Sequence, residues 1–107
     1  WSRPVQFDRC GVLPQLLRMD CGVTLASYGR IGLLVRASSD PAGMQWEEPY
    51  ELMPREPKPF RAESCYYTSM LALDDRTALL AYSDFYVPDN QGVQRKSIMV
   101  RTIHVEE

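Results

Sequence analysis

One arginine of this sequence is placed where a bound molecule could reach it. Arg30 lies between Gly29 and Gly32, and small neighbours leave room for a ligand to approach the backbone. A planar guanidinium can hold a carboxylate through two parallel hydrogen bonds, which a lysine ammonium cannot do. Arg30 is therefore a candidate for binding a substrate carboxylate. The alternative is that it simply ends a strand at the surface, as many arginines do.

Other catalytic patterns are missing from the sequence. The single histidine, His104, alternates with Thr102 and Val100 as an exposed strand residue would. We therefore do not expect it to act as a ligand or a base. The sequence contains no metal-ligand cluster, no phosphate-binding loop and no Ser-His-Asp set. We accordingly expect neither a metal nor another cofactor.

Composition and charge exclude several classes of partner. A length of 107 residues is that of one domain, and the net charge of −2 argues against a surface that tracks nucleic-acid phosphates. No apolar run approaches the roughly 18–20 residues that a membrane helix needs. The odd cysteine count fits no zinc site or disulfide framework, which favours small buried thiols and a reducing, cytoplasmic compartment over secretion. These cysteines are Cys10, Cys21 and Cys65.

The sequence around Arg30 predicts strands and turns. Alternation of side-chain types and turn signals such as Asp20-Cys21-Gly22 predict a first antiparallel meander, whose last strand contains Pro49 and so suits only an edge. Residues 14–19 are too short a run to decide between helix and strand. The predicted strands of this meander are residues 13–19, 23–28, 33–37 and 46–53.

A proline-rich connection over residues 54–59 leads to a second meander. Its predicted strands are residues 66–73, 77–83 and 96–105, with a turn at Asp74-Asp75-Arg76 and an irregular loop over residues 84–94. The chain is thus predicted to be all-β. Two meanders of roughly 40–50 residues match the repeat length of β-propeller blades. We place a first blade at residues 1–53 and a second at 60–107. A small two-sheet sandwich is the alternative.

Four residues carry a resemblance to a known family. Ser38, Asp40, Gly43 and Trp46 are similar to the Asp-box, Ser-x-Asp-x-Gly-x-x-Trp, of the sialidase-like BNR-repeat propellers. The chain departs from that motif by one extra residue before Gly43 and by Gln45 where threonine is common. The resemblance implies one hairpin turn, remote from any active cleft. It also implies that the chain forms about two four-stranded blades, the C-terminal ones, of a larger six-bladed propeller.

The same resemblance suggests site residues. The family has an arginine before the Asp-box strand that grips the substrate carboxylate, and Arg30 occupies that place. Tyr67 matches the catalytic tyrosine of the following blade better than Tyr66, which we expect to pack. Asp84 is either a polar group on the substrate side or a turn residue. The glutamate, aspartate and remaining arginines of such a site lie on earlier blades and cannot be assigned in this chain.

The resemblance implies an exo-acting glycoside hydrolase that cleaves a terminal acidic sugar of the sialic acid type. Its partners would be that carbohydrate and the remaining blades, in the same or another chain. The isolated chain should then be inactive. One alternative is a polysaccharide lyase that acts beside a uronic acid, with tyrosine as base or acid. Another is a non-catalytic glycan-binding or assembly module, because fold alone does not decide function.

Overall fold

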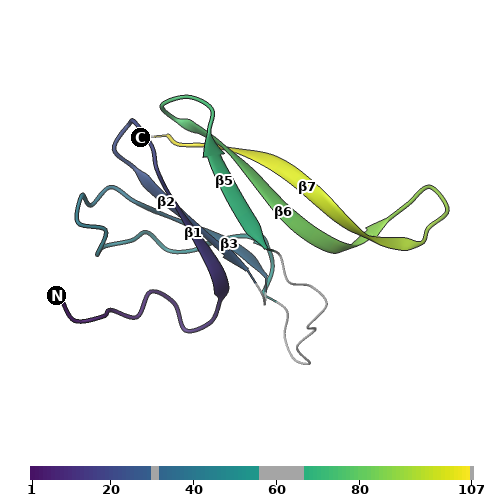
Figure 1. The fold of residues 1–107 in the computed structure, drawn as a ribbon, viewed down its shortest axis with the longest axis horizontal. Helices are drawn as coiled ribbons and strands as arrows, with labels where there is room; N and C mark the ends of the chain where they lie inside the picture. The colour runs from purple at the N-terminus through teal and green to yellow at the C-terminus, as the bar shows by residue number, and fades with distance from the viewer. Residues whose placement is uncertain (30–31, 56–66, 107) are drawn as a thin grey trace.

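The computed structural model describes residues 1–29, 32–55 and 67–106, and over this part the protein is all-β, as predicted (Figure 1). The described strands form one four-stranded and one three-stranded sheet, both antiparallel. Within these residues no helix is long and apolar enough to cross a membrane. The strands in chain order are β1 (Val12–Arg18), β2 (Thr24–Gly29), β3 (Leu33–Ser38), β4 (Tyr50–Met53), β5 (Thr68–Ala72), β6 (Thr77–Pro88) and β7 (Gln94–His104).

The first sheet follows the predicted meander in the order β1-β2-β3-β4. The stretch left undecided between helix and strand is a strand up to Arg18, the end of β1, and β1 pairs with β2 after a shift of register between Val12 and Gln15. The tight turn is confirmed: the Met19 N–H donates to the Val23 carbonyl at 2.8 Å. Gly22 has a φ of 93°, a conformation that costs glycine little. β2 is central and buried on both faces.

The second sheet differs from the prediction at its far end. The expected irregular loop over residues 84–94 is wrong, because β6 continues to Pro88 and β7 begins at Gln94. A bulge between Asp84 and Val87 absorbs the irregularity, and Pro88 stands at the strand end, where a missing N–H is tolerated. The Asp89 N–H donates to the Val93 carbonyl at 2.8 Å and closes the hairpin. The described part of this sheet has three strands.

The two sheets pack together, with β5 beside β1 and β2. Their interface contains one buried polar pair, in which the Ser27 hydroxyl donates to the Thr68 hydroxyl at 2.8 Å. This contact places the end of β2 beside the start of β5. Apolar side chains from both sheets surround it and supply most of the stabilisation from burial. The buried residues of this core are Met19, Leu25, Leu33, Val35, Ala78, Leu80 and Tyr82.

Candidate functional site

The predicted site residues fall in different places. Arg30 lies outside the described residues. Tyr67 precedes β5 and pairs with Ser83: the Ser83 N–H donates to the Tyr67 carbonyl at 3.2 Å, and the Tyr67 N–H donates to Ser83 Oγ at 3.0 Å. The Tyr67 side chain is 48% exposed, whereas Asp84 is buried. Successive strand residues face opposite sides of a sheet, so Tyr67, which shares a face with Ser83, lies opposite Asp84. The structure does not bring these two together.

The resemblance assigns Arg30 and Tyr67 to one substrate site, and this assignment stays a prediction. The described residue before Arg30 is Gly29, at the end of β2. The Ser27–Thr68 hydrogen bond brings this end of β2 beside the start of β5, next to Tyr67. Gly29, the neighbour of Arg30, and Thr68, the neighbour of Tyr67, therefore lie at the same end of the paired sheets.

Ser38, Asp40, Gly43 and Trp46 lie in one turn between β3 and β4, as predicted. The Asp40 carboxylate accepts hydrogen bonds from the main-chain N–H groups of Ala42 at 3.0 Å, Met44 at 2.9 Å and Gln45 at 3.1 Å. These bonds, led by those from Ala42 and Met44, lower the pKa of Asp40 below its usual value. Gly43 has a φ of 69°, which explains why a residue without a Cβ occupies this position.

Ser38 and Trp46 close the turn at its two ends. Ser38 Oγ accepts the Asp40 N–H at 3.1 Å and donates to the Gln45 carbonyl at 2.5 Å. The Trp46 indole N–H donates to the Gly43 carbonyl at 2.8 Å, so the ring lies directly against the turn backbone. The extra residue before Gly43 is accommodated without loss of these contacts. That this turn is remote from an active cleft stays a prediction.

Replacing Ser38 by alanine should lower the free energy of unfolding by about 1–2 kcal/mol, because its buried hydroxyl satisfies two main-chain groups. Ser39→Ala is the matched control, since the neighbouring serine is exposed. Urea denaturation followed by tryptophan fluorescence measures both variants. Equal losses of stability in the two variants would contradict the role of the Ser38 hydroxyl.

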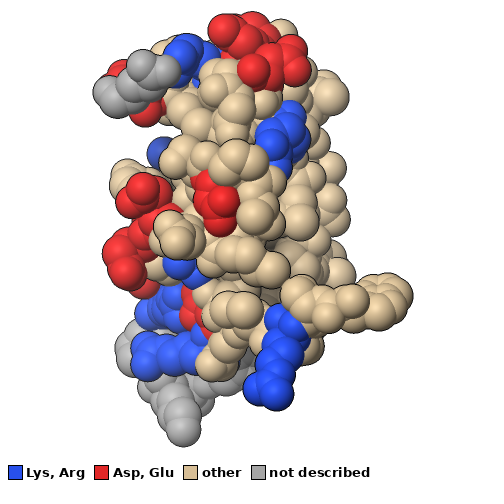
Figure 2. All heavy atoms as spheres, turned by 90° about the vertical axis from the view of Figure 1, so that its left-hand side faces the viewer, with Lys and Arg blue, Asp and Glu red and all other residues tan. Residues whose placement is uncertain are grey.

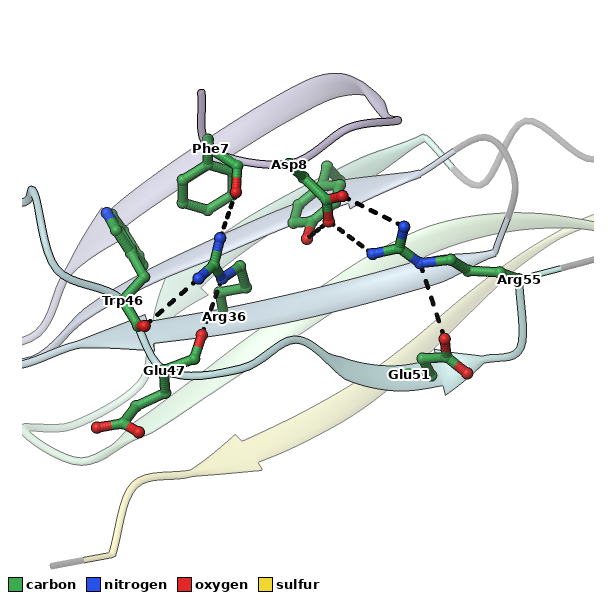
Figure 3. A network of polar contacts seen from close by, with 8 residues as sticks. Phe7, Asp8, Arg36, Trp46, Glu47, Glu51 and Arg55 are labelled. Atoms are coloured by element: carbon green, nitrogen blue, oxygen red, sulfur yellow. Dashed lines mark hydrogen bonds and ion pairs between the residues drawn. The ribbon is translucent and has the colours of Figure 1, made fainter. Parts of the chain in front are cut away.

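The sequence did not suggest a second polar network, which covers the face of the first sheet that points away from the second sheet (Figure 3). Asp8 accepts hydrogen bonds from the Tyr28 hydroxyl at 2.5 Å and from Arg55 Nη1 and Nη2 at 3.2 and 2.6 Å. Burial raises the pKa of Asp8, but the contacts with Arg55 and Tyr28 outweigh it and lower that pKa to about 2. Glu51 extends the network, 3.7 Å from Arg55 Nε.

Tyr28 acts in this network as a hydrogen-bond donor. Burial, together with the hydrogen bond and the charge of Asp8, raises the pKa of its phenol above the ordinary value. An activated tyrosine nucleophile needs its proton removed, and the environment of Tyr28 opposes that. The network therefore holds the N-terminal segment on the sheet and does not resemble a nucleophilic centre.

Arg36 links the N-terminal segment to the turn between β3 and β4. Its guanidinium donates to the carbonyls of Phe7, Trp46 and Glu47, the last at 2.8 Å. It also lies 4.6 Å from the centre of the Phe7 ring, at cation–π distance. A charged residue inside the apolar run of β3 was the one signal in the sequence that could have identified this clamp.

The Asp8–Arg55 pair and Arg36 border a polar cavity of about 430 Å³. Its charged lining residues are balanced in sign, so no single-sign field favours one class of ligand. Among the described residues no group of His, Cys, Asp or Glu could hold a metal ion. Two of its carboxylates are already paired, Asp8 with Tyr28 and Arg55 and Glu51 with Arg55. Its lining residues are Phe7, Asp8, Arg9, Arg36, Glu48, Pro49, Glu51 and Arg55.

The Asp8 contacts predict a pH-dependent contribution to stability. The pKa of Asp8 in the folded protein, about 2, lies below its usual 3.8. Its stabilising effect is therefore complete above about pH 4 and is lost as the pH falls through about 2. At pH 6 the free energy of unfolding of the wild type should exceed that of Asp8→Asn by about 2 kcal/mol, and this difference should shrink towards pH 2. Urea denaturation at a series of pH values measures this. The exposed Asp20→Asn is the control, and a pH-independent difference would contradict the account.

Figure 2 shows that one side of the molecule carries charged groups of both signs beside a broad uncharged area. The charges of opposite sign on this side are intermixed, so this side offers no continuous basic surface to a polyanion.

The comparisons with known proteins supply no assignment: no family model matches the chain, and no curated protein and no solved structure is significantly similar to it.

Proposed function

We propose that the chain forms two blades of a sialidase-like propeller that hydrolyses a terminal acidic sugar. The observation that supports this best is the geometry of the turn after β3. Its carboxylate is bonded to three main-chain N–H groups, its glycine has positive φ, and its indole N–H is bonded back to the turn. This is the local structure that the four Asp-box residues of the resemblance require. The pair of antiparallel sheets is consistent with blades.

The chemistry follows from the substrate. A sialic acid carries a carboxylate on its anomeric carbon, which would repel an anionic nucleophile, whereas a neutral tyrosine avoids that repulsion. Tyr67 would attack the anomeric carbon while a glutamate of another blade takes its proton. The bond to the leaving alcohol breaks, and an acid on another blade protonates that alcohol. Water then attacks the anomeric carbon, the bond from that carbon to the Tyr67 oxygen breaks, the glutamate returns its proton to the phenol, and the free sugar is released.

Arg30 completes the part of the site that we assign to this chain. Arg30 would hold the substrate carboxylate with two parallel hydrogen bonds. The exposure of Tyr67 suits contact with a bound sugar. Asp84 is buried on the opposite face of the second sheet, so we do not assign it a contact with the same sugar.

The replacement Arg30→Lys tests the carboxylate contact in the intact protein. Loss of the two-pronged hydrogen bond should raise KM for a fluorogenic sialoside by about tenfold or more. The exposed Arg101→Lys should leave KM unchanged. An unchanged KM in Arg30→Lys would remove Arg30 from the site. Equal cleavage of neutral and acidic glycosides by wild type would refute the proposed substrate class.

A further inference from the structure

Residues 1–10, the N-terminal segment, are attached to the first sheet by side chains. Among the described residues, no main-chain hydrogen bond joins this segment to a strand. Figure 1 shows it as an irregular trace beside the first sheet. Cavities of about 430 and 400 Å³ border it, whereas the interior of a domain has few voids larger than a water molecule. The segment therefore lies on the sheet like a bound peptide, held at a few points.

The first of these points is an aromatic side chain. The Phe7 ring meets the rings of Tyr28 and Trp46 edge-on, with the ring centres 5.5 and 4.9 Å apart. Arg36 lies 4.6 Å from the centre of the same ring and donates a hydrogen bond to the Phe7 carbonyl (Figure 3). The ring contacts select an aromatic side chain, and the carbonyl contact holds the main chain whatever the sequence.

The second point is the carboxylate of the next residue. Asp8 accepts hydrogen bonds from the Tyr28 hydroxyl at 2.5 Å and from Arg55 Nη1 and Nη2 at 3.2 and 2.6 Å. The side chains of Asp8 and Arg55 are only 11% and 20% exposed. Because a guanidinium and this hydroxyl both donate, they select an acid over the amide of the same shape, which would face them with its own N–H groups.

The junction between the segment and the sheet is strained. Leu13 has a φ of 55°, in the left-handed region that residues with a Cβ rarely adopt. Gly11 lies so close to Tyr28 that a Cβ added there would be 2.6 Å from Cδ2 of the ring. Strain in a tether lowers the effective concentration at which it presents its ligand to a site. A free peptide with the same residues carries no such strain.

We propose that Tyr28, Arg36, Trp46 and Arg55 form a docking site for an extended segment of a partner protein in which an aromatic residue directly precedes an acidic one. Residues 7 and 8 occupy this site from within the same chain, as an internal competitor that the partner displaces. The chemistry of the partner is read from this resident occupant. The proposal does not rest on the proposed glycosidase, to which none of the four residues is assigned.

Binding of a free peptide to the 107-residue chain tests the site. The probe is a fluorescein-labelled peptide of residues 1–10 with serine in place of Cys10, and fluorescence anisotropy gives its Kd. Gly11→Ala pushes the resident segment away but leaves the docking site intact. This variant should bind the probe at least about tenfold more tightly than wild type, whose own segment competes. Gly92→Ala, also at a positive φ but with no neighbour within 4 Å, should bind it as wild type does.

Two altered probes test which side chains are recognised. Peptides carrying Phe7→Ala or Asp8→Asn should each bind the Gly11→Ala chain at least about tenfold more weakly than the original probe, because each loses one of the two points of attachment. Equal affinity of all three peptides would overturn the proposal. So would equal affinity of the original probe for wild type and Gly11→Ala. A dimer of Gly11→Ala in sedimentation that excludes the probe would overturn it in favour of a second copy.

Thiol labelling of wild type decides the matter even if Gly11→Ala does not fold. Cys10 is half-buried and shares a cavity with Tyr28 and residues 7 and 8. A saturating excess of the unlabelled peptide should displace the segment and speed alkylation of Cys10 about threefold or more, as mass spectrometry of proteolytic fragments measures. Cys21, in the turn between β1 and β2, is the internal control and should not change. An unchanged rate at Cys10, or an equal rise at both thiols, would overturn the proposal.

Discussion

In the intact protein, Tyr67→Phe should lower kcat for an acidic glycoside on the order of a thousandfold or more while leaving substrate binding almost unchanged. The reason is that phenylalanine fills the same space but has no oxygen to attack the anomeric carbon. Stopped assays with a fluorogenic sialoside give kcat, and equilibrium binding of a non-hydrolysed acidic sugar gives the affinity. Tyr50→Phe, which changes an exposed tyrosine of the first sheet, is the control.

Two results would contradict the assignment of Tyr67. Full activity of Tyr67→Phe would leave the chain without an assigned nucleophile. Loss of turnover in Tyr66→Phe instead would move the role to the neighbouring tyrosine. Loss of both turnover and binding in Tyr67→Phe would indicate a structural defect, which circular dichroism of the variant then separates from a catalytic one.

The largest expected effect on stability comes from the contact between the sheets. Leu80 is fully buried in β6, where the two sheets meet, so Leu80→Ala removes apolar contacts and leaves a cavity. We expect the free energy of unfolding to fall by about 2–5 kcal/mol. Leu71→Ala makes the same chemical change at a position of the adjacent strand that is 61% exposed in this chain.

Urea denaturation of the 107-residue chain measures both leucine variants. Leu71→Ala should change the free energy of unfolding by no more than about 0.5 kcal/mol, as surface substitutions usually do. Comparable losses for the two would mean that the sheets do not pack through the face containing Leu80. The comparison therefore tests the arrangement of the two sheets independently of any enzymatic activity.

The elements that the sequence predicted well are those fixed by local chemistry. Gly22 and Asp74 terminate strands because a positive φ or a short carboxylate satisfies a turn, and both turns lie where predicted. Side-chain alternation placed β2 and β3 within one residue of their observed bounds. The turn containing Asp40 was also predictable, since its hydrogen bonds join residues at most five apart.

The features that were missed depend on long-range contacts. Asp8 and Arg55 are 47 residues apart, and neither lies in a periodic pattern that would suggest a shared site. The extension of β6 was hidden because Asp84 and Pro88 are both residues typical of loops, whereas a bulge and a strand end accommodate them. Arg36 alone gave a signal, as a charge within an apolar strand.

One measurement tests the proposed reaction most directly. The intact protein is incubated with a sialylated oligosaccharide in water enriched in ¹⁸O, and the mass of the acidic product is measured by mass spectrometry. Hydrolysis through a glycosyl–tyrosine intermediate predicts free sialic acid that carries one ¹⁸O at the anomeric carbon, with ordinary oxygen on the released alcohol. An unsaturated product lighter by one water and free of ¹⁸O would identify a lyase, and no product at all would leave a non-catalytic module; either result contradicts the proposal.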